Sequence, residues 1–528
     1  MDFSESKVWG FLCLIAVLLV ALLVANMLKR KIPFIRKSLI PTSVLAGIII
    51  LVISSIYTIA TKGDYLFELG FFGSPAENEQ DLSLSGLELL EIVTYHCLAL
   101  GFIATAFKPA QQKLSKKRSV EVFNSGVTTV STYLMQAILG MSITILACVL
   151  FPAIMKIGDG PGLIHYAGII LCFGYGQGTG QALNYGKIYQ NINKGIAPTD
   201  ENNYIHNIIG TLGNGTDFGL SIASLGFISA AIGGVIYLII ARRRREKALK
   251  NSDLGETMTL EKVQSSDELP MESSGVDKIT LQLALVLGSY FIAYGIIYLL
   301  GFLFDMFAPK LGMKNTIYGF NFLIGVLVAT IVCALLRFFR KKNIIKHEFV
   351  NPFLMKRIAG FFFDIMIIAG MAAIRPDTLG KYWHVLLIMG VVGAVSTFFY
   401  LKFVANKLFP EYKDEQFLAT YGMLTGTAST GMVLLREWDP KFKTPAADNL
   451  VFQNFPAIAF GLPLMLLAAP KMIAVHPYLV YGILVAFFVV LNIILFRSFI
   501  FKKRKKKTPT SVGDEIDTSE IDLGTKEE

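Results

Sequence analysis

Charged residues are scarce in this chain. Asp, Glu, Lys and Arg together make up 17% of its 528 residues, against roughly 25% in an ordinary soluble domain. A soluble chain of this length would divide into several domains, each with a polar surface around its core. Because so few charged side chains could cover such surfaces, the composition argues against a soluble protein.

Cysteine is also sparse, and its placement argues against two common uses. The five cysteines form no CxxC pair and all fall within apolar segments: Cys13, Cys97, Cys148, Cys172 and Cys333. A disulfide framework or a cysteine metal site shows a characteristic spacing that is missing here. We interpret these residues as small apolar packing side chains.

Motifs for nucleotide and peptide hydrolysis are missing as well. The glycine-rich runs have no preceding strand and no following Lys-Ser/Thr, so they are not phosphate loops. No HExxH or GxSxG motif lies at a plausible depth, which argues against an intramembrane enzyme. We therefore predict no enzyme activity, no ATP-driven transport by this chain alone and no bound cofactor.

Apolar runs of about 20 residues recur along most of the chain, and hydrophobic residues make up 53% of it. A helix of about 20 residues crosses a hydrocarbon layer roughly 30 Å thick. The predicted membrane spans are Val8–Leu28, Leu39–Thr61, Leu87–Phe107, Val127–Ile154, Asn207–Ala241, Ile279–Phe307, Ile317–Phe339, Ile358–Ile374, His384–Val404, Leu450–Ala469 and Tyr478–Phe496.

The net charge of +10 comes from basic clusters between the apolar runs. Such clusters mark cytoplasmic loops under the positive-inside rule, so they do not call for nucleic acid as a partner. Basic residues follow the first and third predicted spans, whereas the loop between them, Lys62–Ser85, is mainly acidic. This alternation predicts a multi-pass protein of the cell inner (plasma) membrane, with the N-terminus outside and the C-terminus cytoplasmic.

Two further apolar segments, Gly162–Tyr189 and Phe417–Trp438, are interrupted by glycine and threonine. The arginines of 242–245 and the basic residues of 502–507 both stay cytoplasmic only if each segment is a re-entrant hairpin. The predicted fold is therefore an all-α polytopic membrane protein with two inverted-topology repeats. Each repeat has five transmembrane helices and one re-entrant hairpin, and an extra helix follows at the C-terminus.

This fold sets the expected domain boundaries. Residues 1–245 form the first repeat, with a hairpin at about 162–190, and residues 278–470 form the second, with a hairpin at about 417–438. A cytoplasmic linker, 246–277, joins them. The extra span covers 471–501, and residues 502–528 are expected to be a disordered cytoplasmic tail because they are polar and acidic.

The two interrupted segments share a pattern. Phe173–Gly180 and Tyr421–Ala428 both follow aromatic, Gly, two variable residues, Gln or Thr, Gly, Thr and a small residue. Unwound carbonyls and Thr hydroxyls can hold Na⁺, and half-helix N-termini attract an anionic group. Close packing of helices would use the same small residues. The predicted substrate- and ion-binding residues are Gly174, Gly176, Gln177, Gly178, Thr179, Gly180, Gln181, Asn184, Gly422, Thr425, Gly426, Thr427, Ser429 and Thr430.

Three short motifs resemble the bacterial sodium/glutamate symporter family. Gly174–Gly180 is similar to that family's glycine-rich segment, Ile40–Gly47 to its I-P-x-x-V-x-G motif, and Met135-Gln136 to its Met-Gln pair. Their order extends the resemblance to about residue 470, although Gln177 stands where the family has His. The resemblance implies Na⁺-coupled uptake of an anionic amino acid, a homodimer and an alternation between the two halves by elevator or rocking motion.

Polar residues inside predicted spans are further candidates. Gln136 could hydrogen-bond a hairpin or join helices, and Asp364 could be functional or pair with a nearby cation. Asn454 could begin a broken helix facing the site. The leading prediction is Na⁺-coupled symport of glutamate or a related small anionic solute across the lipid bilayer. The alternatives are a di- or tricarboxylate or neutral amino acid as substrate, H⁺ coupling through Asp364 or His96, and a channel.

Overall fold

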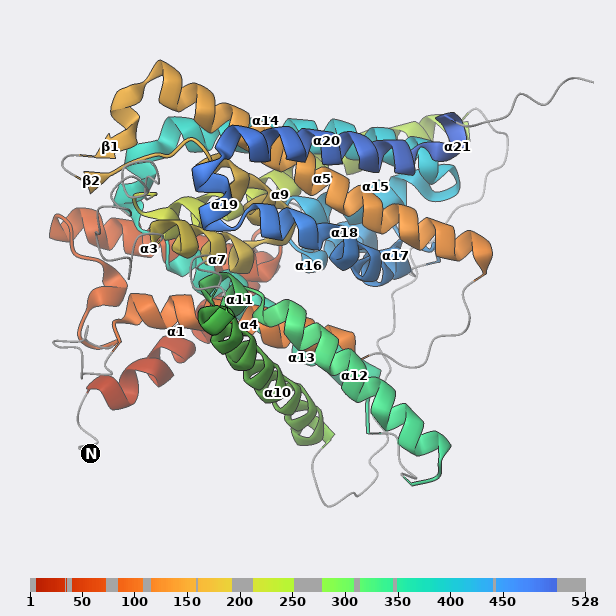
Figure 1. The fold of residues 1–528 in the computed structure, drawn as a ribbon, viewed down its shortest axis with the longest axis horizontal. Coiled ribbons are helices and arrows are strands. Elements are labelled where there is room, and N and C mark those ends of the chain that lie inside the picture. The colour runs from red at the N-terminus through yellow and green to blue at the C-terminus, as the bar shows by residue number, and fades with distance from the viewer. Residues whose placement is uncertain are drawn as a thin grey trace, which may run out of the picture.

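The computed structural model describes residues 6–33, 35, 40–72, 84–107, 115–157, 160–191, 212–250, 278–307, 314–344, 349–439 and 443–500. Helices make up nearly all of this part of the chain (Figure 1). The expected tail 502–528 and residues 251–277 of the expected linker lie outside the described residues, as do residues 207–211 of one predicted span.

The first half holds helices α1 to α9 and one small sheet. Its elements are α1 (Ser6–Lys31), α3 (Thr42–Thr61), η1 (Leu66–Glu68), α4 (Gly86–Ala106), α5 (Lys116–Leu150), η2 (Pro152–Met155), β1 (Lys156–Ile157), β2 (Gly160–Pro161), η3 (Ala167–Ile169), α6 (Ile170–Gln177), α7 (Thr179–Gln190) and α9 (Gly215–Lys250). The strands β1 and β2 pair antiparallel. These two strands, of two residues each, are a small departure from the expected all-α fold.

The second half holds helices α10 to α21. Its elements are α10 (Lys278–Phe307), α11 (Lys314–Gly319), α12 (Asn321–Lys341), α13 (Pro352–Ala372), α14 (Pro376–Leu408), η5 (Pro410–Tyr412), α15 (Lys413–Leu424), α16 (Ala428–Trp438), α17 (Ala446–Phe452), α18 (Asn454–Leu467), α19 (Pro470–Val475), α20 (Pro477–Leu495) and α21 (Arg497–Ile500). Long helices therefore follow the predicted apolar runs.

Local sequence explains several helix starts. Before α4, the Ser85 hydroxyl accepts the Glu88 N–H and the Glu88 carboxylate accepts the Ser85 N–H, which is a capping box. Before α13, the Asn351 side chain accepts the Leu354 N–H, and Pro352 occupies the first turn, where no N–H is needed. These caps place helix starts next to the predicted spans.

Nine helices in the described residues are long and apolar enough to cross a membrane. This part of the chain is thus an α-helical bundle of the kind that multi-pass membrane proteins form. The single span predicted at Leu450–Ala469 is wrong, because α17 ends at Phe452 and α18 begins at Asn454. Pro456 has no N–H to donate to the Phe452 carbonyl, which accounts for the interruption.

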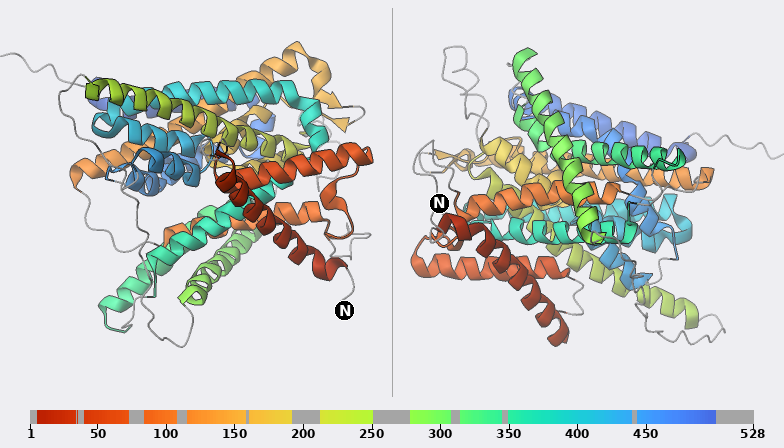
Figure 2. Two further views of the ribbon diagram at one scale, coloured as in Figure 1. Left: turned by 180° about the vertical axis from the view of Figure 1, so that it is seen from behind. Right: turned by 90° about the horizontal axis from the view of Figure 1, so that it is seen from below.

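The helices form two groups that differ from the two halves of the sequence. The α4 group contains α1, α3, α4, α10, α12 and α13, and the α5 group contains α5, α6, α7, α9, α14, α15, α16, α18 and α20. In Figure 1, α10 and α12 extend away from the layer of α5, α14 and α20, and Figure 2 shows the same separation from behind and below. The groups meet mainly where α7 packs on α4 and α13.

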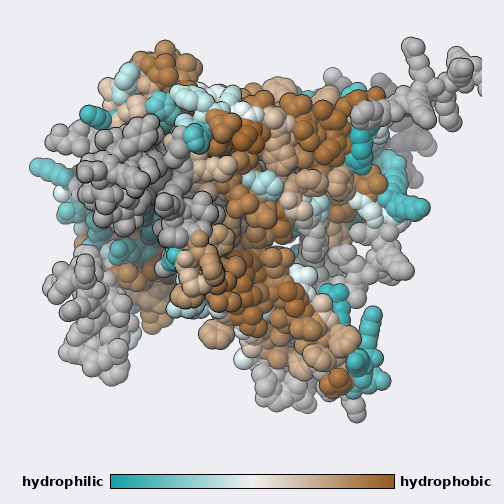
Figure 3. Space-filling view, viewed as in Figure 1, coloured by the Kyte–Doolittle hydropathy of each residue, from teal (hydrophilic) through white to brown (hydrophobic). Residues whose placement is uncertain are grey.

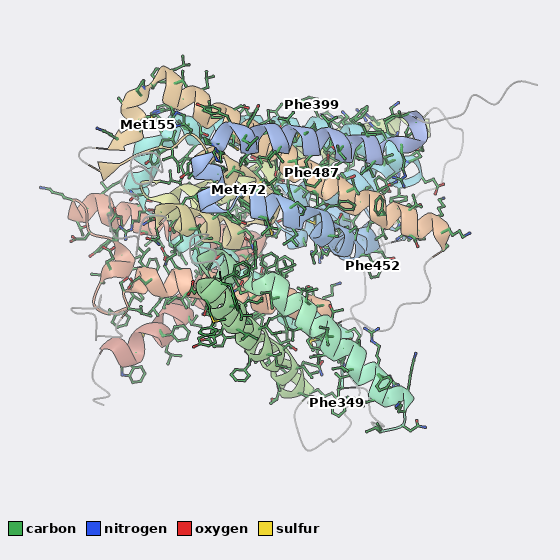
Figure 4. All side chains as sticks on the ribbon, viewed as in Figure 1. Met155, Phe349, Phe399, Phe452, Met472 and Phe487 are labelled. Carbon is green, nitrogen blue, oxygen red and sulfur yellow. The ribbon has the colours of Figure 1, made fainter. Side chains whose placement is uncertain are left out.

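Outward-facing side chains of the long helices are strongly apolar. Figure 3 shows this as a brown surface over α10 and α12, where Phe291 is 77% exposed. On the other side of the bundle, Phe399 of α14, labelled in Figure 4, is 63% exposed. Basic residues lie at the end of α12, among them Arg340 and Lys341. An apolar band with charge beyond its edge suits a protein surrounded by lipid.

Candidate functional site

The first interrupted segment is a pair of short helices joined by one residue. Helix α6 ends at Gln177, α7 begins at Thr179, and Gly178 between them has φ 81° and ψ −169°. This combination is open to glycine and strained for other residues. The predicted departure from a single spanning helix is confirmed here, and its cause is the backbone conformation of Gly178.

The second interrupted segment breaks in another way. Helix α15 ends at Leu424 and α16 begins at Ala428, so Thr425, Gly426 and Thr427 form the connection. The Thr427 hydroxyl accepts the Thr430 N–H at 3.4 Å and caps α16. The departure from a single spanning helix is confirmed here too.

The two breaks touch each other. A Cβ atom built on Gly178 would lie 3.1 Å from Thr427 Cγ2 and 3.3 Å from the Gly426 carbonyl oxygen. Residues from the two halves of the chain, far apart in sequence, are therefore in contact. The matched sequence pattern thus corresponds to a single place in the fold.

Gln136 of α5 holds the second break. Its Nε2 donates to the Leu424 carbonyl at 2.9 Å and to the Thr397 hydroxyl at 3.0 Å. Its Oε1 is buried without a hydrogen-bond partner and lies 3.1 Å from the position of a Cβ on Gly176. Both interpretations open from sequence apply, because Gln136 hydrogen-bonds the interrupted segment at Leu424 and also joins α5 to α14 at Thr397.

Stacked rings fix the first break. The Phe173 and Tyr185 rings on α6 and α7 lie 3.7 Å apart between centroids and 6° from parallel. The Tyr185 hydroxyl donates to the Met465 carbonyl at 3.0 Å. Helices α6 and α7 are thus held to each other, and α7 is held to α18.

A buried chain of amides and hydroxyls fixes the second break. Gln453 Oε1 accepts the Ser125 hydroxyl at 2.6 Å, and Gln416 Nε2 donates to the same hydroxyl at 3.2 Å. Asn449 Nδ2 donates to Gln416 Oε1 at 2.9 Å and to the Tyr412 hydroxyl at 3.1 Å. These bonds tie α15 to α5 and to the α17–α18 junction.

A cavity of about 160 Å³ lies beside the touching breaks, between the α4 and α5 groups. Six predicted residues line it: Gly176, Gln177, Gln181, Gly426, Thr427 and Asn454. Asn454 begins α18, as expected for a broken helix facing the site. The cavity therefore receives residues from both breaks and from α18.

Two amide side chains at the cavity lack partners. Gln181 is 1% exposed, and neither its Oε1 nor its Nε2 has a hydrogen-bond partner among the described residues. Gln177 Nε2 is likewise buried and without a partner there. Because a buried amide without hydrogen bonds is costly, these atoms point to a bound molecule that satisfies them.

The wall opposite the amides is aromatic and comes from the α4 group. Phe102 of α4 lies 5.4 Å from both Phe322 of α12 and Phe363 of α13, measured between ring centroids, and all three line the cavity. Sequence reasoning missed these residues. With 40 Phe in the chain, nothing in their local sequence separates them from lipid-facing ones.

Several predicted residues lie beside the cavity in packing roles. Gly174 approaches Ile222, Gly180 approaches Leu98, and Gly422 packs against Gly431. Close approach of helices, the alternative left open by the sequence, accounts for these three glycines.

Predicted polar residues away from the cavity bond the protein itself. The Thr425 hydroxyl donates to the Tyr421 carbonyl at 2.6 Å, and Asn184 Nδ2 donates to the Gly319 carbonyl at 3.3 Å. Thr179 is fully buried with only a 3.5 Å contact to the Met366 carbonyl. Thr430 lies 3.3 Å from the Thr427 hydroxyl, oxygen to oxygen. The Ser429 side chain lies outside the described residues.

The ionisable candidates lie away from the cavity. Asp364 of α13 forms a hydrogen bond with Ser43 of α3. His96 shares a 2.7 Å hydrogen bond with the Tyr290 hydroxyl on the outer side of α4. Lys187, beyond the first break, pairs with Glu91. Among the described residues, no Asp, Glu, Lys or Arg lines the cavity.

Comparison with known proteins supplies no relative for this site. No protein-family model matches the chain, and a search of curated proteins finds no match either. The function has to be inferred from the cavity, the two breaks and the two groups of helices.

Proposed function

We propose that this protein is a secondary active transporter that carries a small anionic solute together with Na⁺ by alternating access. One observation carries the proposal: two interrupted segments from opposite halves of the chain touch beside a cavity that contains unpartnered amides. Broken helices meeting at a buried site are typical of ion-coupled transporters, because half-helix ends can bind ions and solutes inside a membrane.

The order of the elements supports an inverted repeat. In the first half, α1, α3 and α4 join one group and α5, α6, α7 and α9 the other; in the second, α10, α12 and α13 join the first group and α14, α15, α16 and α18 the second. Each half thus contributes three long helices, then one long helix, then an interrupted pair. With the alternating loop charges, this supports two re-entrant hairpins in opposite orientation, and a cytoplasmic C-terminus.

Both kinds of helix end, the C-terminal end with partial negative charge and the N-terminal end with partial positive charge, lie at the two touching breaks. Helices α6 and α15 end there with their carbonyl groups, and α7 and α16 begin there with their N–H groups. Carbonyl oxygens suit Na⁺, and helix N-termini suit an anion. The resemblance to sodium/glutamate symporters makes glutamate the first solute to test and a homodimer the expected assembly.

The boundary between the two groups supports a relative motion. Near the first break, two contacts across this boundary involve a glycine: Gly370 of α13 contacts Thr179, and Leu98 of α4 contacts Gly180. Helices that contact each other through such residues can slide past one another while few hydrogen bonds are lost. We propose that the α5 group carries the cavity residues of both breaks past the α4 group.

Coupling to H⁺ is the second candidate. Asp364 shares a hydrogen bond with Ser43 where α13 packs on α3, and a carboxyl group inside a membrane protein is often a proton carrier. An Asp364→Asn variant separates the two possibilities. It should abolish proton-driven uptake and leave Na⁺-driven uptake in place.

Purified protein in liposomes tests the proposal. A panel of labelled anionic solutes, glutamate included, is offered with an inward Na⁺ gradient, with equal Na⁺ on both sides, and with a pH gradient. We expect saturable accumulation of at least one solute that requires the Na⁺ gradient, and counterflow from preloaded liposomes. Accumulation of no solute under any gradient, or flux without saturation as in a channel, contradicts the proposal.

A further inference from the structure

The cavity has two chemically different sides. Phe102, Phe322 and Phe363 form an aromatic wall, and Met366 of α13 adds an apolar side chain on the same side. The opposite side carries the amides of Gln177 and Gln181. A ligand that fits both sides has a substantial apolar body and a polar group at one end.

The polar side suits one negative group. Helix α7, of 12 residues, begins at Thr179 without any side-chain cap, so no side chain competes for its first N–H groups, and Gln181 of its first turn lines the cavity. Helix α16, of 11 residues, begins there as well, and its Ala428 lines the cavity. Gln181 lies in the first turn of α7 with a free Nε2. Together, helix N–H groups and an amide N–H can receive the two oxygens of a carboxylate.

The cavity offers no charged partner for a second charge. Among the described residues that line it there is no carboxylate to pair with an ammonium group and no Lys or Arg to pair with a second carboxylate. Glutamate would bring two carboxylates and one ammonium group. Burying the extra charges without charged partners would cost far more than hydrogen bonds to the remaining polar side chains, which include Thr105, Thr330 and Asn454, would recover.

We propose that the cavity binds a monocarboxylate with an apolar body and without an ammonium group. Its carboxylate lies against Gln181 and the start of α7, and its hydrocarbon part lies against the three phenylalanines. The inference rests on the proposed transport function for its biological meaning and narrows that function to a class of substrate that the family resemblance does not suggest.

Equilibrium binding to the full-length protein in lipid nanodiscs tests this choice. The probe is labelled 4-methylpentanoate, which is leucine without its ammonium group. The competitors are leucine, glutarate, glutamate and 4-methylpentanamide, and Na⁺ is present throughout. We expect the probe to bind saturably and each competitor to be at least about tenfold weaker, because each adds an unpaired charge or removes the carboxylate.

Two substitutions at one position connect the binding to the cavity. Gln181→Leu removes the free amide, and Gln181→Glu keeps the shape but brings a negative charge against the carboxylate. We expect at least about tenfold weaker binding of the probe in both. Gln190→Leu is the matched control on the same helix, because Gln190 Oε1 accepts the Thr216 N–H at 3.0 Å at the far end of α7, and its probe affinity should stay unchanged.

The outcomes separate this inference from the transport proposal. Competition by glutamate or glutarate at the strength of the probe, unchanged affinity in both Gln181 variants, or no probe binding at all overturns the inference. Accumulation of a dicarboxylate in liposomes together with any of these results leaves the transporter standing with another substrate. Selective probe binding without gradient-driven uptake supports the cavity assignment and overturns the transport function.

Discussion

The two breaks that touch at the cavity differ in how they are made. The α6–α7 break uses a single residue, Gly178, in a backbone conformation reserved for glycine, and its following helix has no side-chain cap. The α15–α16 break uses three residues and lets the Thr427 hydroxyl cap the next helix. The described part of the second break has no residue with positive φ.

This difference separates a binding role from a supporting one. The uncapped start of α7 and the free amides of Gln177 and Gln181 leave hydrogen-bonding groups for a ligand. In the second break, Thr425 and Thr427 use their hydroxyls on their own backbone. We infer that the first break supplies most of the binding groups and that the second closes the cavity against it.

The largest effect should follow from Gly178→Ala. The alanine would be strained by about 1–3 kcal/mol in this conformation, and its methyl group would lie 3.1 Å from Thr427 Cγ2. Transport and thermal stability in detergent should both fall. Gly426→Ala, on the opposite break, brings its methyl group to 3.0 Å from the Phe227 ring and 3.2 Å from the Gly422 carbonyl oxygen but causes no backbone strain, so its loss of stability should be smaller. Equal losses in the two variants would contradict the distinction between the breaks.

Gln136→Leu should have the next largest effect. The variant keeps the approximate volume but leaves the buried Leu424 carbonyl without its donor, a cost of about 1–3 kcal/mol. Because Gln136 bonds only the second break directly, hydrogen exchange should increase in α15 and α16 more than in α6 and α7. Faster exchange confined to the first break would show that the bond to Leu424 is unimportant.

The smallest effects come from the two matched threonines. Thr427→Val removes the cap of α16 and should cost about 1 kcal/mol, seen as a lower unfolding temperature. Thr179→Val replaces a hydroxyl whose contact to the Met366 carbonyl is a long 3.5 Å, so its effect should be a few tenths of a kcal/mol. A larger loss in Thr179→Val than in Thr427→Val would reverse the proposed roles of the breaks.

Much of the fold could be predicted because hydropathy and loop charge act locally. The predicted span Leu87–Phe107 agrees with α4 to within one residue at each end. Helices α5, α13 and α14 begin six to eleven residues before their predicted spans, because polar residues continue the helix beyond the apolar run. The helix break near Gln453 was expected at Asn454, but Leu450–Ala469 was still counted as a single span because most of its residues are apolar. The helix is interrupted there because Pro456 has no N–H to donate, although the mean hydropathy of the stretch stays high.

The candidate site was predictable only in its glycines and polar residues. The pattern around Gly178 and Gly426 marks both breaks, because few other residues allow such short connections. The phenylalanine wall and the split between cavity-lining Gln181 and packing Asn184 were not predictable. Both depend on which helix of another group lies opposite a side chain, and no local pattern encodes that.

The sequence by itself determined where most of the long apolar helices lie, which polar segments separate them and that the two Gly/Thr segments are interrupted. Those properties follow from the chemistry of neighbouring residues. Only the tertiary structure decided that the two breaks touch, that the helices regroup across the two halves, and that a cavity with free amides on one side and rings on the other lies between them. These depend on contacts between residues distant in the chain, where packing selects one arrangement among many.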